Sequence, residues 1–132
     1  MLASLGMGQT VDQAVEIAAP ADRVWELIST SEGLSGWFVN ATVVPGAAGS
    51  VTLRFAPGAE GTVPVLVWDP PRRIRFGMPD GGRVHDISVT EAGAGCQVRV
   101  RDEGVSDAEA AATAAGWEGY LGKLRSLAEA AP

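Results

Sequence analysis

Apolar and polar residues alternate along residues 11–18, which predicts a half-buried strand. The face expected to be buried carries Val11, Gln13, Val15 and Ile17. Pro20 suits the first turn of a helix, and the apolar positions between Val24 and Ile28 give that helix one buried stripe. The next residues, 31–37, predict a second short helix, although Gly33 and Gly36 lower its intrinsic propensity.

The middle of the chain consists of short apolar stretches separated by turn residues at intervals of about 8 to 12 residues. This spacing is typical of consecutive antiparallel strands. The predicted strands span residues 40–44, 50–56, 60–68, 72–77, 83–90 and 96–102. Because Pro64 has no backbone N–H, an edge or a bulge is expected at its position.

The pattern changes to a helical period in residues 106–130, where one face carries Trp117, Tyr120, Leu121, Leu124, Leu127 and Ala128. Ser106 is the expected N-cap residue. The first half of this helix carries mostly alanine, so it leaves room for a ligand cavity beside it. The alternative is that these alanines are simply good helix formers on an exposed turn.

The predicted order is one strand, two short helices, about six strands and one long helix, which indicates an α+β fold. The terminal helix is the only predicted element long enough to cover the sheet. We therefore expect a curved antiparallel sheet of about seven strands around it, in a single domain of residues 11–130 after a flexible tail, residues 1–10.

Composition narrows the classes of partner. The 132 residues carry a net charge of −6, which argues against a nucleic acid or an anionic membrane as partner. No segment is apolar for long enough to span a bilayer, and the N-terminus lacks the pattern of a signal peptide. The single cysteine, Cys96, rules out an intrachain disulfide and favours a reducing compartment. A cytoplasmic location is expected.

Four groups of residues resemble one known family, in the same order along the chain. The first is the run 19–28 followed by Leu34 and the pair Trp37-Phe38. The others are Gly61 with the run 69–74, Gly95 with Val98, Val100 and Gly104, and Gly116-Trp117 with Leu121 and Leu124. Together they resemble the Hsp90-ATPase-activator-homologue family of the START/Bet v 1-like (SRPBCC) superfamily.

The resemblance implies the helix-grip fold, in which a seven-stranded sheet curls around the C-terminal helix and leaves a deep cavity between them. Relatives with this fold bind lipids, sterols or polyketides, catalyse cyclisation or hydrolysis, or act on the chaperone Hsp90. The resemblance thus implies the fold more sharply than the activity. One position departs from the family pattern, because Asp102 stands where many members have a histidine.

Three residues are candidates for acid–base chemistry, namely Asp102, His85 and Tyr120. Asp102 continues the apolar face of Val98 and Val100, so it either enters the cavity or lies solvated at the strand end. His85 is the only histidine and lies in phase with Arg83 and Ile87. It is expected either to face the cavity or to be a surface or hydrogen-bonded histidine.

The residues expected to contact an apolar ligand are Trp37, Phe38, Phe55, Phe76, Val100, Trp117, Tyr120 and Leu121. The arginines expected on the solvent face of the sheet, with an anion clamp as the alternative, are Arg54, Arg73, Arg75, Arg99 and Arg101. No metal site and no cofactor are predicted.

Three functions remain open. The leading hypothesis is a binding protein for a small apolar or aromatic molecule of lipid or polyketide type. The second is an enzyme of the cyclase or hydrolase kind that moves a proton on a bound carbonyl compound. The third is a domain that interacts with an Hsp90-type chaperone. A homodimer through an exposed strand edge is a further hypothesis.

Overall fold

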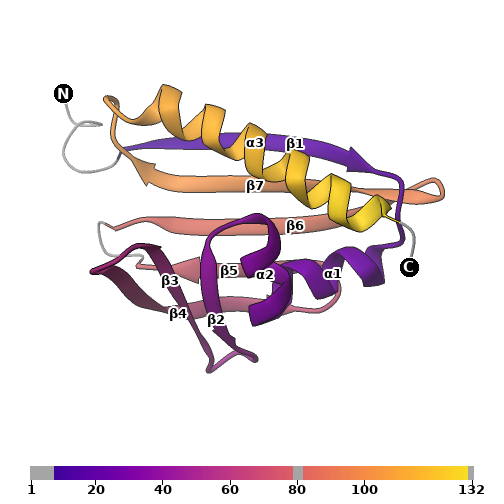
Figure 1. Ribbon diagram of the computed structural model, residues 1–132, viewed down its shortest axis with the longest axis horizontal. Coiled ribbons are helices and arrows are strands. Elements are labelled where there is room, and N and C mark those ends of the chain that lie inside the picture. Colours follow the sequence, from indigo (N-terminus) through magenta and orange to yellow (C-terminus); the bar gives the residue numbers. More distant parts are fainter. Residues whose placement is uncertain (1–7, 79–81, 131–132) are drawn as a thin grey trace.

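Within residues 8–78 and 82–130, which the computed structural model describes, seven strands form one antiparallel sheet (Figure 1). Its order is β1-β7-β6-β5-β4-β3-β2. The elements are β1 (Gln9–Ile17), α1 (Ala21–Ser29), α2 (Ser31–Trp37), β2 (Asn40–Val44), β3 (Ser50–Ala56), β4 (Ala59–Asp69), β5 (Arg73–Gly77), β6 (Val84–Ala92), β7 (Gly95–Val105) and α3 (Ala110–Glu129).

All three of these helices lie on one face of the curved sheet (Figure 1). The helix α3 runs diagonally over β1 and β7, and α1 and α2 cover the neighbouring part of the sheet. This arrangement confirms the predicted α+β helix-grip fold. Among the helices of the described ranges, none combines the length and the apolarity needed to cross a bilayer.

Several element ends differ from the sequence-based prediction, most of them by one or two residues, and β1 and α3 differ where they begin. The strand β1 begins at Gln9, two residues early, and residues 1–7 of the predicted tail lie outside the described residues. The helix α3 begins at Ala110 and not at Ser106. The backbone N–H of Glu109 donates to the carbonyl oxygen of Ser106 at 3.0 Å, so a separate three-residue turn precedes the helix.

The strand β4 changes partner beside Pro64. Ser50 of β3 pairs with Pro64, whereas the next residue, Val65, already pairs with Phe76 of β5. The register then shifts between Val65 and Val67, so a bulge lies next to the proline as the sequence predicts. The first half of β4 consequently forms, with β2 and β3, a wall that turns away from the rest of the sheet.

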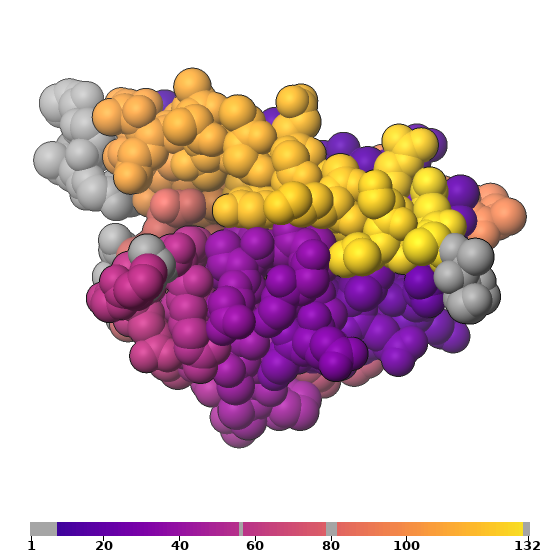
Figure 2. Space-filling view, viewed as in Figure 1, coloured from indigo at the N-terminus to yellow at the C-terminus, as the bar shows by residue number. Residues whose placement is uncertain are grey.

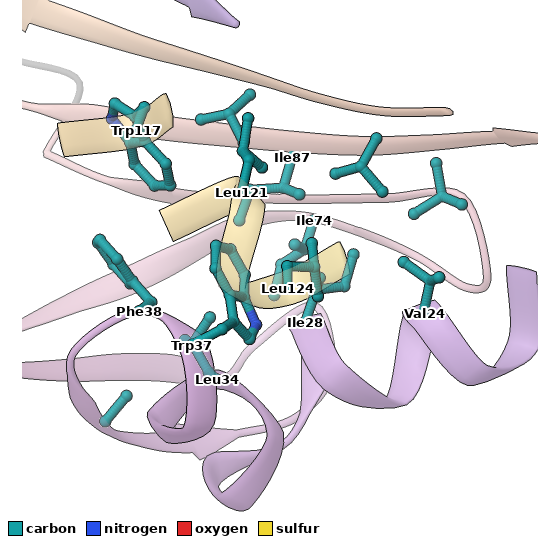
Figure 3. Packing of buried hydrophobic residues seen from close by; sticks show 14 of the residues in the cluster. Val24, Ile28, Leu34, Trp37, Phe38, Ile74, Ile87, Trp117, Leu121 and Leu124 are labelled. Atoms are coloured by element: carbon teal, nitrogen blue, oxygen red, sulfur yellow. The ribbon is translucent and has the colours of Figure 1, made fainter. Parts of the chain in front are cut away.

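The core fills the space between the sheet and the helices. Val24 and Ile28 of α1 and Leu124 of α3 are completely buried, and they pack with Ile74 of β5 and the neighbouring strands (Figure 3). This core lies beside the second half of α3, where the large apolar residues of the stripe are. No residue of α3 before Trp117 is buried in this core.

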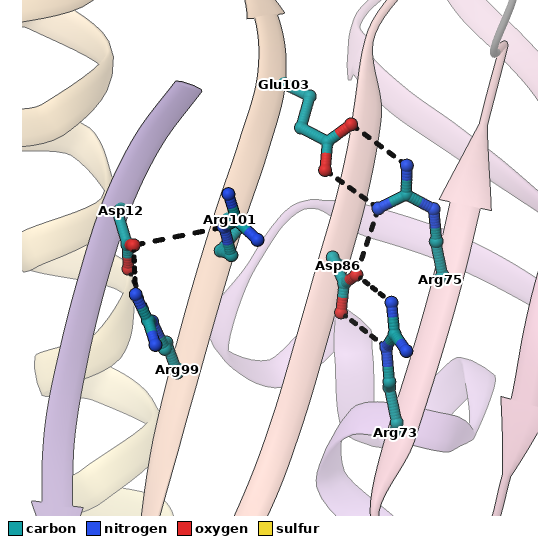
Figure 4. Close-up of polar contacts among 7 residues, drawn as sticks. All are labelled: Asp12, Arg73, Arg75, Asp86, Arg99, Arg101 and Glu103. Carbon is teal, nitrogen blue, oxygen red and sulfur yellow. Dashed lines mark hydrogen bonds and ion pairs between the residues drawn. The ribbon is translucent and has the colours of Figure 1, made fainter.

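The opposite face of the sheet carries ion pairs (Figure 4). Arg73 and Arg75 bind Asp86, and Arg75 also binds Glu103. Burial alone would raise the pKa of Asp86, but the hydrogen bonds from the two guanidinium groups more than offset it and hold the pKa below its usual range.

The other arginines expected on this face are also paired there. Arg99 binds Asp12 with two hydrogen bonds, and Arg101 lies 3.9 Å from the same carboxylate. Arg54 binds Glu60 at 2.8 Å. None of the five arginines lines the pocket described below.

Candidate functional site

A pocket of about 470 Å³ lies between the first half of α3 and the strands β3, β4, β6 and β7. In Figure 2 the orange half of α3 and the magenta strands β3 and β4 border this part of the surface, with a salmon-coloured part of the chain between them. The volume falls in the range of small-molecule sites. The lining residues are Phe38, Leu53, Phe55, Gly61, Val63, Gly77, Met78, Arg83, His85, Asp102, Glu109, Ala112, Thr113, Gly116, Trp117 and Tyr120.

Small residues on α3 create this space. The helix faces the pocket with Ala112, Thr113 and Gly116, whose side chains fill little volume. A Cβ atom built on Gly116 would meet no atom within 4 Å, and the same holds for Gly61 on the opposite wall. The alanine-rich half of the helix therefore lies beside open space, whereas its leucine-rich half lies against the core.

Aromatic rings form one wall of the pocket. Phe38 stacks on Trp117 with ring centres 4.9 Å apart and meets the edge of Tyr120 at 5.0 Å. Phe55 lies edge-to-face with Phe38, with ring centres 6.3 Å apart, and is itself 59% exposed. These rings come from three separate segments, namely the end of α2, the strand β3 and the helix α3, so only the folded chain assembles them.

An ion pair between a buried carboxylate, Asp102, and a partly exposed arginine, Arg83, forms the polar end of the pocket. Asp102 is only 1% exposed and receives hydrogen bonds from Nε and Nη2 of Arg83, at 2.9 and 2.5 Å. Its Oδ2 also accepts a 2.8 Å hydrogen bond from Nε1 of Trp117. Because burial of an unpaired charge is costly, these partners explain how a carboxylate can lie so deep.

Gly104 brings the backbone before β6 close to β7. Its φ is +79°, and a Cβ atom there would lie 2.3 Å from the carbonyl oxygen of Gly82. A side chain at this position would push the two segments apart. The close approach places Arg83, the next residue after Gly82, within reach of Asp102.

His85 lies opposite Asp102 in the β6–β7 ladder and belongs to the same polar end. Its ring stacks on Phe76 at 5.2 Å, and its Nε2 lies 3.7 Å from Oδ1 of Asp102, beyond hydrogen-bonding distance. Burial lowers the pKa of the imidazole, an effect that Asp102 opposes and Arg83 reinforces. This shift favours the neutral form of the imidazole.

The three candidates for acid–base chemistry all line the pocket. The expectation that Asp102 could lie solvated at the strand end is wrong, because Arg83 and Trp117 hold it inside. The expectation of a surface or hydrogen-bonded His85 is also wrong. The residue is 7% exposed, and no described residue forms a hydrogen bond with its side chain.

The eight residues expected to contact a ligand divide into two groups. Phe38, Phe55, Trp117 and Tyr120 line the pocket. The other four, Trp37, Phe76, Val100 and Leu121, do not line it and are at most 2% exposed in the core. Trp37 shows the reason, since its Nε1 donates to the carbonyl oxygen of Leu27 at 2.8 Å and thus fixes α2 against α1.

Several lining residues were not predicted from the sequence, above all Arg83, Glu109 and Thr113. A signal for Arg83 was present, because it lies two residues before His85 and so shares its face of the strand. Glu109 carried no comparable signal, since the prediction placed it inside a helix that begins one residue later, at Ala110.

In the described part of the chain, no group of three histidine, cysteine or acidic side chains converges. Cys96 is buried, and burial raises the pKa of its thiol.

Solved structures with the same fold are numerous. Bacillus halodurans protein BH1534 is 21% identical, with a TM-score of 0.81, over 93% of this chain and 99% of that one. Aha1 from Colwellia psychrerythraea, solved as a dimer, is 18% identical, with a TM-score of 0.75, over 92% of this chain and 96% of that one. These likenesses show the fold alone.

A third structure is DynU16, described as a protein in the dynemicin biosynthetic locus. It is 23% identical, with a TM-score of 0.74, over 89% of this chain and 46% of that one, so this chain spans less than half of its length. A search of curated proteins finds no match. A family model covers residues 8–131, and on that match the chain belongs to the family described as polyketide cyclase / dehydrase and lipid transport.

Proposed function

We propose that this protein binds a small apolar or aromatic molecule, of lipid or polyketide type, between the sheet and the first half of α3. The observation that carries the proposal is the pocket of about 470 Å³ with one aromatic wall and one polar end. Sites of this kind are typically concave, mostly apolar and already formed before the ligand arrives. The family, whose description includes lipid transport, supports the same class of ligand.

A pair of glycines on α3 allows a direct test. Gly116 lines the pocket and Gly119 does not, and a Cβ atom on either would meet no atom within 4 Å. We expect Gly116→Leu to fill the pocket and Gly119→Leu to leave it open. Both variants add the same side chain to the same helix, so they share any effect on helix stability.

The probe for this test is N-phenyl-1-naphthylamine, a neutral apolar dye whose fluorescence rises in an apolar site. We expect the wild type and Gly119→Leu to bind it, and Gly116→Leu to bind it at least tenfold more weakly. Circular dichroism would verify that all three proteins are folded. Equal binding by both leucine variants, or no binding by the wild type, would contradict the proposal.

A second candidate function is catalysis on a bound carbonyl compound, because Asp102, His85 and Tyr120 all line the same pocket. A neutral imidazole is a competent general base near pH 7. The test is exchange of the α-protons of 2-tetralone in D₂O, followed by NMR. Exchange that is faster with the wild type than with His85→Phe would support catalysis, and equal rates would count against it.

The finer sequence-based hypotheses remain proposals. Membership of the activator-homologue group would imply an Hsp90-type chaperone as partner, which a pull-down with the cognate chaperone would test. A homodimer through an exposed strand edge is a further proposal, which the dimeric Aha1 structure supports, and light scattering after size-exclusion chromatography would test it. The cytoplasm is the proposed location, because the sequence contains a single cysteine.

A further inference from the structure

We propose that the polar end of the pocket recognises a neutral oxygen group of the ligand, a hydroxyl or a carbonyl, and rejects a carboxylate. This inference rests on the proposed binding function and makes it more specific. Two observations support it. The charges at the polar end are already paired with one another, whereas some of its hydrogen-bonding groups have no described partner.

The positive charge of Arg83 is already compensated. Two of its nitrogens, Nε and Nη2, bind the two oxygens of Asp102, which is the bidentate arrangement that arginine and a carboxylate prefer. The carboxylate of Glu109, which also lines the pocket, adds a second negative charge near the guanidinium. A ligand carboxylate would be the third negative group around one positive one.

The N-terminus of α3 does not reverse this balance. Its backbone N–H groups would favour an anion, but Glu109 occupies the N-cap position and contributes a carboxylate there. The side chain of Glu109 is in turn held by the hydroxyl of Ser106, with Oγ and Oε1 3.0 Å apart. The negative charge at the helix end is therefore supplied by the protein itself.

Hydrogen-bonding capacity remains open at two positions. The third nitrogen of Arg83, Nη1, forms no hydrogen bond with a described residue. This nitrogen can donate a hydrogen bond to a ligand oxygen. His85 is 7% exposed, and no described residue is hydrogen-bonded to its ring. Among the described residues, every completely buried side-chain nitrogen or oxygen has a hydrogen-bond partner, so a ring nitrogen of His85 without one is not completely buried. Because His85 lines the pocket, we take this nitrogen to be accessible from it.

The imidazole is held in place for this role by its neighbours. Phe76 stacks on one face of the ring at 5.2 Å, and Phe38 and Trp117 approach it at 5.9 Å. A neutral imidazole has one donor and one acceptor nitrogen, so it can bind either a carbonyl or a hydroxyl group. An apolar ligand lying along Phe38 and Trp117 would place an oxygen at its end between His85 and Arg83.

Three ligands of nearly the same shape test the inference, namely 2-methylnaphthalene, 2-naphthol and 2-naphthoate. At pH 7.5 the first two are neutral and the third is an anion. We expect the wild type to bind 2-naphthol about tenfold more tightly than 2-methylnaphthalene, and 2-naphthoate at least tenfold more weakly than 2-naphthol. Competition with N-phenyl-1-naphthylamine gives all three affinities.

A variant assigns the preference to His85. In His85→Phe the stacked ring is kept and the nitrogens are lost, so 2-naphthol should lose most of its advantage over 2-methylnaphthalene. The affinity for 2-methylnaphthalene itself should change little. Arg54→Met, which removes an arginine paired with a carboxylate on the outer face, is a control that should change no affinity.

The outcomes separate this inference from the proposed function. If 2-methylnaphthalene binds and 2-naphthol binds no better, the pocket exists but its polar end selects nothing, and the inference is wrong. Tightest binding of 2-naphthoate would also overturn it, because it would show an uncompensated positive charge. If neither the dye nor any of the three ligands binds, the proposed function itself fails.

Discussion

Trp117 of α3 and Asp102 of β7 are joined by a 2.8 Å hydrogen bond from the indole Nε1 to Oδ2 of the carboxylate. Both side chains are at most 2% exposed. The same indole stacks on Phe38 in the aromatic wall, and the same carboxylate holds Arg83 in the polar end. This one contact therefore connects the two halves of the pocket and ties the long helix to the sheet.

Loss of this hydrogen bond should destabilise the protein measurably. Trp117→Phe keeps an aromatic ring but removes the N–H, and we expect a loss of about 2 kcal/mol in the free energy of unfolding, since the acceptor is a buried carboxylate. Urea denaturation followed by circular dichroism would measure it. The control is Trp25→Phe, because no described residue accepts a hydrogen bond from the Trp25 indole. A loss in this control as large as in Trp117→Phe would contradict the role of the bond.

Stability should fall as the pH drops below about 6.5. Burial lowers the pKa of His85 in the folded state below its ordinary value of about 6.5, so the unfolded chain takes up a proton first. The stabilisation is fully present above pH 6.5 and is lost as the pH falls through the folded-state pKa, at a rate of at most about 1.4 kcal/mol per pH unit.

The measurement is the free energy of unfolding between pH 7.0 and pH 5.5, where few other side chains titrate. His85 is the only histidine, so His85→Phe should remove most of the slope in this range. An unchanged slope in the variant would show that the histidine is equally easy to protonate in both states.

The ion pairs on the outer face should contribute unequally. The Asp86 side chain is 9% exposed and binds two arginines, whereas the Asp12 side chain is 36% exposed and binds Arg99 at the surface. We expect Asp86→Asn to cost about 2 to 4 kcal/mol of stability and Asp12→Asn less than about 1 kcal/mol. Chemical denaturation of both variants would test this order, and similar losses would refute it.

Two glycines in α3 should tolerate alanine with a gain in stability. A Cβ atom on Gly116 or Gly119 meets nothing within 4 Å, and alanine is favoured over glycine in a helix by about 1 kcal/mol. We expect each replacement to raise the midpoint of thermal unfolding. Gly33→Ala in α2 is the opposite control, because its Cβ would lie 2.4 Å from the carbonyl oxygen of Glu26. Lower midpoints for both α3 variants would contradict this expectation.

The sequence by itself determined the order and type of the elements. Their signals are local, since alternation marks a strand, a helical period marks α3, and proline or glycine marks the turns between them. That the Asp102 side chain points inward could also be predicted, because Asp102 lies on the same face of the strand as Val98 and Val100. The space beside the first half of α3 could be predicted as well, because this half carries alanine and glycine whereas the second half carries larger residues.

Only the tertiary structure decided which inward residues meet the pocket and which are sealed. Trp37 and Trp117 share the same apolar character, but Trp37 is fixed in the core by the carbonyl of Leu27. The depth of Asp102 likewise depends on Arg83 and Trp117, which come from other elements. Burial and charge compensation are sums over neighbours distant in the chain, so no local pattern contains them.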